Sequence, residues 1–482
     1  MKNKISLILG SLVFLLLIFI PLNLPFCQKI TLATALLMAI FWATEPIPIP
    51  VTSLFPLILF PLFGVQSSDK IAKTYIDPVI FLFLGGFILA TAVEKWNLHY
   101  RISLQILTFF KGNLSLTLLG FIISTAFLSM WISNTATTMM MLPIVLSVIN
   151  LLKEKGYSPI ENYSKALLLS IAYSSSIGGI GTLIGSPPNL LFASFYSRQF
   201  PQNPVTFFKW FIFAFPLVLI LIPILWIILI FYSGGFSKLK GNFQDLNDYL
   251  FSEKKKIGKI SKEERTVFMV FFVVCLLWIF RAPISFGSFK LLGWANIFTH
   301  PSFFHDSFVA ILGAVFLFII KIDKRRILDW NEVEKKVPWG ILLLFGGGLA
   351  LASVVIESGL SKSIAETFGK FQGLPFPLFL FFTCTLMVIL TEFTSNTAIT
   401  ATMLPILFSI VPQNTNPIIL LLPATISASL AFMLPVATPP NAIVFSSGNL
   451  KVSDMLKFGI ILDIIALALL CTFSLLFLKI IF

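Results

Sequence analysis

Two short segments of this chain carry the same run of hydrogen-bonding side chains in apolar surroundings. The triplet Ser-Asn-Thr occupies positions 133–135 in "MWISNTATTMMMLPI" and positions 395–397 in "FTSNTAITATMLPI". At the start of a helix, side-chain oxygens of this kind cap the first amide groups. The remaining amide groups, together with the positive end of the helix dipole, can face an anion. The two triplets therefore predict anion contacts at two helix starts.

A second pair of motifs supplies chemistry suited to cations. "GSPPN" at 185–189 and "ATPPN" at 437–441 each interrupt an apolar run with two consecutive prolines. Because proline lacks an amide hydrogen, each pair breaks the helical ladder and leaves carbonyl oxygens free around Gly185 and Ala437. Hard cations such as Na⁺ prefer oxygen ligands. We expect side-chain oxygens to complete two small cages, from Ser129, Ser133 and Asn134 in one and Thr391, Ser395 and Asn396 in the other.

The composition places these motifs in a membrane. Of the 482 residues, 57% are hydrophobic and only 11% are charged, which is poorly compatible with a soluble globular protein. The formal net charge of +13 does not predict a nucleic-acid partner, because the basic residues lie between apolar runs and form no solvated basic face. The sequence contains neither a paired-carboxylate motif nor HExxH, so we do not expect an enzyme. We predict an all-α polytopic membrane protein in the lipid bilayer.

A length of about 20 apolar residues per membrane-spanning helix divides the chain into eleven crossings. Eight are uninterrupted, near 5–22, 30–46, 79–97, 207–232, 264–284, 305–321, 338–356 and 455–480. The segment 48–66 is kinked by its prolines, and 165–197 and 416–446 are interrupted by the Pro-Pro motifs. Two further stretches, 113–150 and 374–412, are too short for two spans and too polar at the centre for one. We predict that both are re-entrant hairpins with a Ser-Asn-Thr triplet at the tip.

Charge asymmetry orients this arrangement. When the N-terminus is placed in the cytoplasm, most of the 34 lysines and arginines fall on the cytoplasmic side, as the positive-inside rule requires. The first apolar run has no small-residue cleavage site after it, so we interpret it as a span and not a signal peptide. The sequence thus predicts a multi-pass protein of the cell (inner) membrane, with the C-terminus outside.

The motifs belong to an internal repeat. The first triplet recurs 262 positions later, and the same displacement pairs "GGFILAT" from Gly85 with "GGLALAS" from Gly347. The Pro-Pro motifs recur 252 positions apart. Five crossings separate the two copies, so the halves are inverted. Inverted repeats with discontinuous helices are typical of secondary transporters.

Taken together, the two triplets, each followed by "MLP", the two Pro-Pro motifs and "TEPIPIPVTS" at 44–53 resemble the divalent anion/sodium symporter family over nearly the whole chain. The resemblance implies a homodimer in which a transport domain moves as an elevator against a scaffold domain. It further implies C4-dicarboxylates, citrate or sulfate as substrates, coupled to several Na⁺ ions. Both triplets are intact, which resembles the dicarboxylate-transporting members.

The resemblance also assigns roles to individual residues. It implies a first sodium site from Ser129, Ser133, Asn134 and the Gly185 carbonyl, and a second from Thr391, Ser395, Asn396 and the Ala437 carbonyl. It implies that the substrate lies against Ser133, Asn134, Thr135, Ser395, Asn396, Thr397, Thr438 and Pro439. It divides the chain into scaffold helices at 1–112, a first transport part at 113–232, a cytoplasmic basic loop at 233–263, further scaffold helices at 264–372 and a second transport part at 373–482.

These observations predict a sodium-coupled symporter of divalent organic anions such as succinate, malate and fumarate, with at least two Na⁺ ions. No lysine or arginine lies in a hairpin tip or a helix break, so nothing there replaces the sodium charge, and this favours symport. Transport of sulfate, citrate or another anion, and dicarboxylate exchange, remain alternatives. An anion channel is disfavoured by the inverted repeat. Glu392, beside Thr391, is the one acidic residue that we expect near the site.

Overall fold

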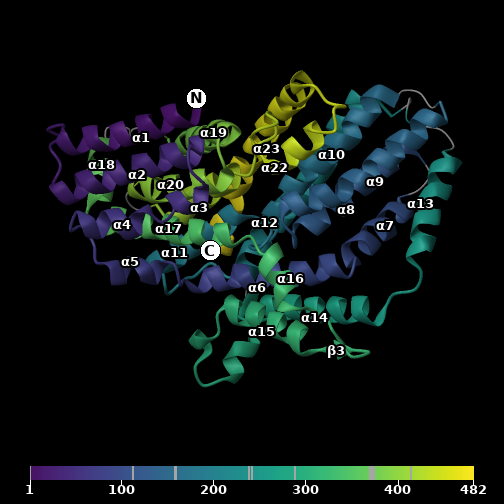
Figure 1. The fold of residues 1–482 in the computed structure, drawn as a ribbon, viewed down its shortest axis with the longest axis horizontal. Coiled ribbons are helices and arrows are strands. Elements are labelled where there is room, and N and C mark those ends of the chain that lie inside the picture. The colour runs from purple at the N-terminus through teal and green to yellow at the C-terminus, as the bar shows by residue number, and fades with distance from the viewer. Residues whose placement is uncertain are drawn as a thin grey trace.

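The computed structural model describes residues 2–110, 113–156, 160–236, 239, 243–286, 289–368, 375–412 and 415–482, which are mostly helical (Figure 1). By length and composition, seven helices in this part of the chain are able to cross a membrane. The predicted domain boundaries at 112 and 373, and the first residue of the hairpin at 374, lie outside the described residues.

Helices occupy all eight uninterrupted spans: α1 (Lys2–Phe19), α2 (Phe26–Thr44), α6 (Pro78–Lys95), α12 (Phe207–Tyr232), α14 (Lys262–Ile279), α15 (Asp306–Ile319), α17 (Trp339–Glu357) and α23 (Val452–Ile481).

The proline-rich segment at 48–66 is broken into two short helices. They are α3 (Ile49–Thr52) and α4 (Phe55–Leu62). Pro56 is the second residue of α4, where a missing amide hydrogen costs nothing because the first amides of a helix have no partner within the helix. The segment predicted as a kinked span is therefore divided between Thr52 and Phe55.

Each Ser-Asn-Thr triplet joins two helices. The first hairpin is α8 (Leu114–Ser129) and α9 (Asn134–Glu154), which lie side by side in Figure 1. The second is α19 (Phe376–Phe393) and α20 (Asn396–Ser409). Both second arms start at the asparagine of the triplet, so a serine occupies the N-cap position of each helix.

Both Pro-Pro motifs start a helix after a break. The first broken helix consists of α10 (Ile160–Ile180) and α11 (Pro187–Gln199), and the second of α21 (Ile418–Ser427) and α22 (Pro439–Phe445). The two hairpins pack against these helices crosswise. Helix α9 contacts both α10 and α22, while α20 contacts both α21 and α11. Each hairpin thereby joins the broken helix of its own half to that of the other half.

Short elements connect the long helices. The segment 233–263, expected as a basic loop, contains the amphipathic helix α13 (Gln244–Ile257), which buries Leu246 and Leu250 one turn apart. The other connecting elements are α5 (Ser68–Thr74), α7 (Leu98–Phe109), η1 (Trp294–Ile297), η2 (Pro301–Phe303), α16 (Trp330–Lys336), α18 (Leu360–Phe368) and the antiparallel pairs β1–β2 (Ile284–Phe286, Phe289–Leu291) and β3–β4 (Lys321–Ile322, Arg325–Arg326).

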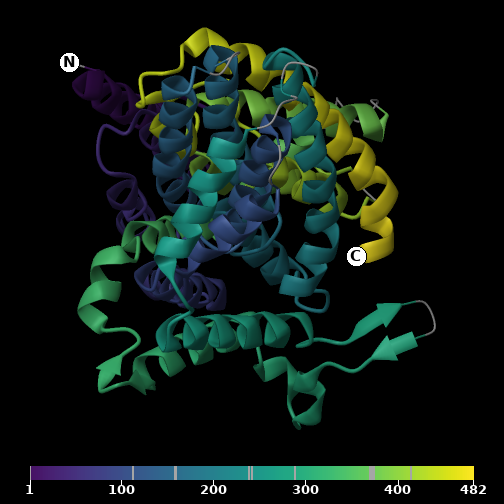
Figure 2. The same cartoon turned by 90° about the vertical axis from the view of Figure 1, so that its right-hand side faces the viewer.

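Helices α14 and α15 form a layer on one side of the molecule, seen as the teal and green helices at the bottom of Figure 2. Helix α15 packs along α6 at close range. A β-carbon on Gly85 would lie 2.6 Å from the backbone carbonyl carbon of Ala310, so only glycine permits this approach.

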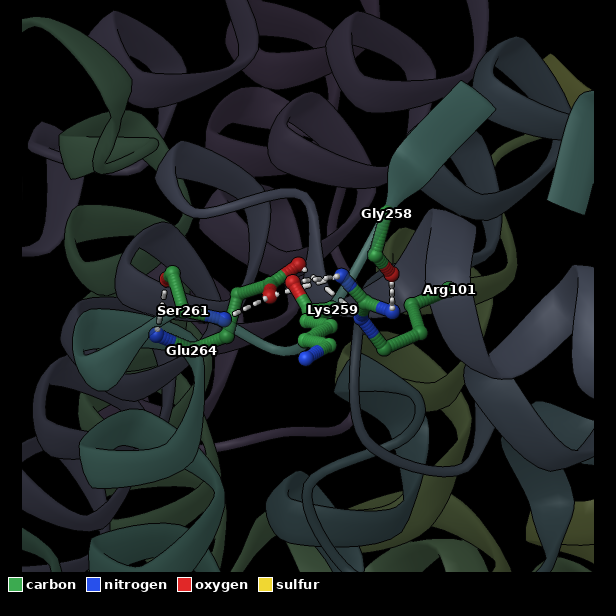
Figure 3. A network of polar contacts seen from close by, with 5 residues as sticks. All are labelled: Arg101, Gly258, Lys259, Ser261 and Glu264. Carbon is green, nitrogen blue, oxygen red and sulfur yellow. Dashed lines mark hydrogen bonds and ion pairs between the residues drawn. The ribbon is translucent and has the colours of Figure 1, made fainter. Parts of the chain in front are cut away.

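Arg101 of α7 holds the link between α13 and α14 (Figure 3). Its guanidinium donates to the two oxygens of Glu264 at 3.1 and 2.9 Å, and to the carbonyls of Gly258 and Lys259 at 3.0 and 3.2 Å. Glu264 also accepts the Ser261 amide at 2.7 Å, and the Ser261 hydroxyl accepts the Glu264 amide at 3.0 Å, which is a capping box at the start of α14. One arginine thus connects α7, the linker and α14.

We predict that Arg101→Ala lowers the stability of the protein by about 3 kcal/mol, because removing one partner of a buried ion pair leaves an uncompensated charge. The Arg101 and Glu264 side chains are only 13% and 8% exposed. Thermal unfolding of the purified protein in detergent measures the loss. Lys262→Ala is the control, since Lys262 and its partner Asp323 are each 74% exposed and exposed pairs contribute little. Equal melting of the two variants would contradict the role of Arg101.

Candidate ion and substrate site

The first half of the candidate site forms where the first hairpin turns. Ser129 is the last residue of α8 and Asn134 the first of α9. The Ser129 hydroxyl oxygen lies 2.6 Å from the Ser175 carbonyl oxygen in α10 and 2.7 Å from the Asn134 Oδ1 atom. Since a hydroxyl has one hydrogen, it can donate to only one of these two oxygens at a time. The turn therefore gathers more acceptors than donors.

The Asn134 amide faces these acceptors and one more. With its nitrogen turned inward, that nitrogen lies 3.1 Å from the Ser175 carbonyl, 3.3 Å from the Gly185 carbonyl and 2.7 Å from the Ser129 hydroxyl. With its oxygen turned inward, four oxygens meet, which is favourable only with a cation among them. The side chain can thus fill the cluster itself or complete an oxygen cage. Ser129, Asn134 and Gly185, three of the four residues predicted for the first cage, lie together here.

Two glycines allow the broken helix to approach the Asn134 side chain and its own other half this closely. A β-carbon on Gly179 would overlap the Asn134 Oδ1 atom, and one on Gly185 would lie 2.6 Å from the Gly179 carbonyl oxygen. The residues 252 positions further on are Ala431 and Ala437. The second half therefore accommodates a β-carbon at both places, while the first half does not.

The second half repeats the same three-way contact. The Thr391 hydroxyl oxygen at the end of α19 lies 2.7 Å from the Ala428 carbonyl oxygen, and also 2.7 Å from the Asn396 Oδ1 atom. Thr391 is fully buried, and Ala437, whose carbonyl was predicted as a ligand, is buried at the end of the same helix break. The Ser175 and Ala428 carbonyls were not predicted, because they lie before the helix breaks and away from the Pro-Pro motifs that indicated Gly185 and Ala437.

An asparagine spans each helix break. The Asn189 side-chain nitrogen donates to the carbonyls of Gly179 and Thr182 at 2.9 and 2.8 Å. Asn441 donates to the two carbonyls at the matching positions, 252 residues further on, at 3.0 Å each. These side chains close the breaks by replacing lost helical hydrogen bonds. Sequence reasoning noted the motifs but gave the asparagines no role, although their recurrence after both proline pairs was the available signal.

Capping differs between the two triplets. The Ser133 hydroxyl accepts the Ala136 amide at 3.3 Å, so it caps α9 as predicted. Ser395 has the extended backbone of a capping residue, but its side chain makes no hydrogen bond to α20. The prediction of a side-chain cap is therefore wrong for the second triplet, because the hydroxyl is not directed at the first amides of the helix.

The residues predicted to meet the substrate surround these helix starts. Thr438 precedes α22 and its hydroxyl oxygen accepts the Asn441 amide at 3.3 Å, which leaves the hydroxyl hydrogen available for another acceptor. Thr397 and Thr438 are buried, and Pro439 is exposed. Thr135, Asn134, Ser133, Ser395 and Asn396 are half-buried. The set therefore combines buried hydroxyls with partly accessible ones.

A separate cavity of about 350 Å³ contains arginines, but their charges are compensated. Arg198 pairs with Asp77 at 2.7 Å, and Arg281 pairs with Asp306. A dianion in this cavity would have to compete with two carboxylates. The cavity is therefore less suited to binding a dianion than the predicted site.

The fold and the two half-sites define the class as a secondary transporter of the membrane. The chain belongs to the sodium:sulfate symporter family, whose transmembrane-region profile matches residues 1–482. It is 42% identical over 478 residues to the sodium-dependent dicarboxylate transporter SdcS of Staphylococcus saprophyticus, covering 96% of this chain and 89% of that protein. It is 39% identical over 483 residues to SdcS of Staphylococcus aureus strain NCTC 8325, covering 96% and 88%. These matches confirm the family resemblance predicted from the motifs.

Two solved structures share the fold at low sequence identity. The MtrF antimetabolite efflux pump of Neisseria gonorrhoeae superimposes with a TM-score of 0.59 at 14% identity, covering 95% of this chain and 97% of that one. The YdaH transporter of Alcanivorax borkumensis gives a TM-score of 0.57 at 10% identity, covering 85% and 87%. At these identities the likeness concerns the fold alone.

We predict that Gly179→Ala weakens Na⁺ binding about tenfold, because the added methyl group would displace the Asn134 amide and overpacking of this kind costs about 1 to 3 kcal/mol. The measurement is the thermal stabilisation of the purified protein as NaCl replaces KCl at constant ionic strength. Ala431→Gly is the matched variant in the second half and should leave the Na⁺ titration within about twofold, since it removes a methyl group that is tolerated there. An unchanged titration in Gly179→Ala would contradict the predicted cage.

Proposed function

We propose that the protein is a sodium-coupled symporter of divalent organic anions, most simply C4-dicarboxylates such as succinate, malate and fumarate. The observation that carries this proposal is the cluster of Ser129, Asn134, Ser175 and Gly185 oxygens, which needs a cation when the Asn134 oxygen faces inward. Two relatives at about 40% identity are sodium-dependent dicarboxylate transporters, which agrees with it.

The charge balance explains why sodium and substrate would bind together. No lysine or arginine occurs in the hairpin tips or helix breaks, so a dianion there meets only neutral donors. Burying an unpaired charge in a medium of low dielectric constant is costly. Na⁺ ions held beside the helix starts offset that cost. Sodium is then required for substrate binding and not only for movement.

The proposed site has two sodium positions and one substrate position between them. The first sodium is held by Ser129, Ser133, Asn134 and the Gly185 carbonyl, and the second by Thr391, Ser395, Asn396 and the Ala437 carbonyl. Substrate carboxylates bind to the Ser-Asn-Thr triplets, Ser133 to Thr135 and Ser395 to Thr397, and to Thr438, with Pro439 packed against them. The matching contacts of Ser129 and Thr391 support an equivalent role for the two halves.

The wider mechanism is also a proposal. The two halves would be inverted relative to each other, and the hairpins with the broken helices would form a transport domain that moves as an elevator in a homodimer. The crosswise packing of α9 on α22 and of α20 on α11 supports treating these helices as one moving unit. We place the N-terminus in the cytoplasm and the C-terminus outside, on the basis of the charge asymmetry.

Uptake of labelled succinate into proteoliposomes tests the proposed activity. We expect uptake driven by an inward Na⁺ gradient and little uptake when K⁺ replaces Na⁺. Competition by malate, fumarate, citrate and sulfate separates the dicarboxylate assignment from the alternative anions. Uptake that is unchanged without sodium, or that requires a counter-substrate inside, would favour exchange, and a current that does not saturate would favour a channel.

We predict that Asn134→Ala and Asn396→Ala each reduce sodium-driven uptake at least about a hundredfold, since each removes a ligand shared by a cation and the substrate and leaves charged groups unsatisfied. Asn296→Ala, at an exposed position in η1, serves as the control and should transport normally. Surface expression and gel-filtration profiles are compared for all three. Near-normal uptake in both site variants would refute the assignment.

A further inference from the structure

Two connecting segments, 254–265 and 321–326, carry a large excess of positive charge. Together they contain ten basic and three acidic residues. Lys254 donates to the Thr108 hydroxyl, Lys256 pairs with Glu253, and Lys262 pairs with Asp323. The other seven basic side chains are exposed and have no ion pair or side-chain hydrogen bond within the described part of the chain. They are Lys255, Lys259 and Arg265 in the first segment and all four in the second.

The two segments meet and form one surface, which we call the basic surface. The Lys262 amino group lies 3.4 Å from the Asp323 carboxylate, so the start of α14 contacts the turn between β3 and β4. Arg101 holds the Gly258 and Lys259 carbonyls and thereby fixes the first segment against α7. Helix α13, the start of α14 and β3 lie along one side of the molecule, at the right of Figure 1. The sequence did not indicate this surface, because Lys262 and Asp323 are 61 residues apart.

The basic surface lies at the level where the membrane meets water. Helix α14 starts at Lys262 and α15 ends at Ile319, so two predicted spans end here. Trp330, four residues after the last arginine of β4, packs against Trp339 with ring centroids 6.2 Å apart, and the two are 53% and 38% exposed. Exposed tryptophans are typical of membrane–water interfaces. Ile260, between the lysines of the first segment, is 49% exposed and adds an apolar contact.

We propose that the basic surface binds the headgroups of anionic phospholipids, such as phosphatidylglycerol, in the leaflet that it faces. Clusters of four to eight basic residues beside a membrane-spanning helix attract anionic lipids. The guanidinium groups of Arg325 and Arg326 match the geometry of a phosphodiester. Apolar Ile260 and the tryptophan pair favour a lipid over a soluble polyanion. This lipid site goes beyond the proposed transport activity and does not depend on it.

Thermal unfolding of the purified protein in mixed micelles tests the lipid site. Phosphatidylglycerol replaces phosphatidylcholine at constant total lipid, and we expect it to stabilise the protein. Because each basic residue near an anionic surface contributes separately, removing four should lower the apparent affinity for phosphatidylglycerol about tenfold or more. The variant is Lys255→Gln/Lys259→Gln/Arg325→Gln/Arg326→Gln. A control with the same loss of charge at other exposed positions should stay within about twofold: Lys73→Gln/Lys153→Gln/Lys457→Gln/Lys479→Gln.

Equal losses in the two variants overturn the proposal. So does equal stabilisation of the unmodified protein by phosphatidylcholine, by soluble glycerol 3-phosphate or by an RNA oligonucleotide. None of these measurements involves transport, so a failure of the proposed symport would leave the lipid site standing, and the reverse also holds.

A second measurement needs no variant and decides the question if the variant does not purify as a single species. The unmodified protein in lipid nanodiscs is treated with a lysine-acylating reagent, and the labelling rate of each lysine is read by mass spectrometry. Phosphatidylglycerol should slow the labelling of Lys259 and Lys324 at least about threefold more than that of Lys457, because bound headgroups cover these amino groups. Equal changes at all three lysines overturn the proposal.

Discussion

The structure depends on the requirement that every backbone polar group inside a membrane finds a partner. Two helices are broken at Pro-Pro motifs, and each break leaves amide and carbonyl groups without their helical partners. The side chains of Asn189 and Asn441 each donate hydrogen bonds to two of these carbonyls in their own break. The groups that remain differ between the two halves. The Ser175 and Gly185 carbonyls face the Asn134 side chain, and the Met433 and Leu434 amides donate to the Glu392 carboxylate.

These two environments suit different partners. Around Asn134 the oxygens form a cage for a cation when the amide oxygen turns inward, which is the basis of the proposed sodium site. Around Met433 two amides donate to the carboxylate of Glu392. The two halves of the chain therefore share the frame of hairpin and broken helix, but they are not chemically equivalent. Gly179 and Gly185 in one half, against Ala431 and Ala437 in the other, belong to the same asymmetry.

No lysine or arginine occurs in the hairpin tips or helix breaks of the candidate site, and several arginines elsewhere are paired. Arg198 and Arg281, which line a cavity, each form an ion pair with an aspartate, and Arg101 of α7 pairs with Glu264 of α14. An anion that enters the site therefore finds helix starts, hydroxyls and amides, but no fixed cation. Under the proposed mechanism, bound sodium ions therefore lower the free energy of the bound anion. Substrate binding then requires sodium, and this requirement is a direct physical basis for coupled transport.

The sequence by itself determined the membrane-embedded helical fold, all eleven apolar segments, the positions of the two hairpins and the two helix breaks. Hydrophobic length and proline have local effects, so spans and breaks can be located from neighbouring residues alone. The repeated triplets also predicted that Ser129, Asn134, Thr391 and Asn396 belong to the candidate site. The sequence did not indicate α13 within the basic segment, the missing cap at Ser395 or the spanning role of the two asparagines.

Only the tertiary structure decided which partners meet. The Ser175 and Ala428 carbonyls lie 46 and 37 residues along the chain from the hydroxyls they contact, and no proline pair beside them indicates that they are free. Glu392 accepts the Met433 and Leu434 amides, 41 and 42 residues further along the chain, and no residue near Glu392 in the sequence indicates these partners. Contacts of this kind arise because helices pack through their side faces, so residues that are distant in sequence share one buried polar environment. The half-sites therefore could be located from the sequence, but their partners could not.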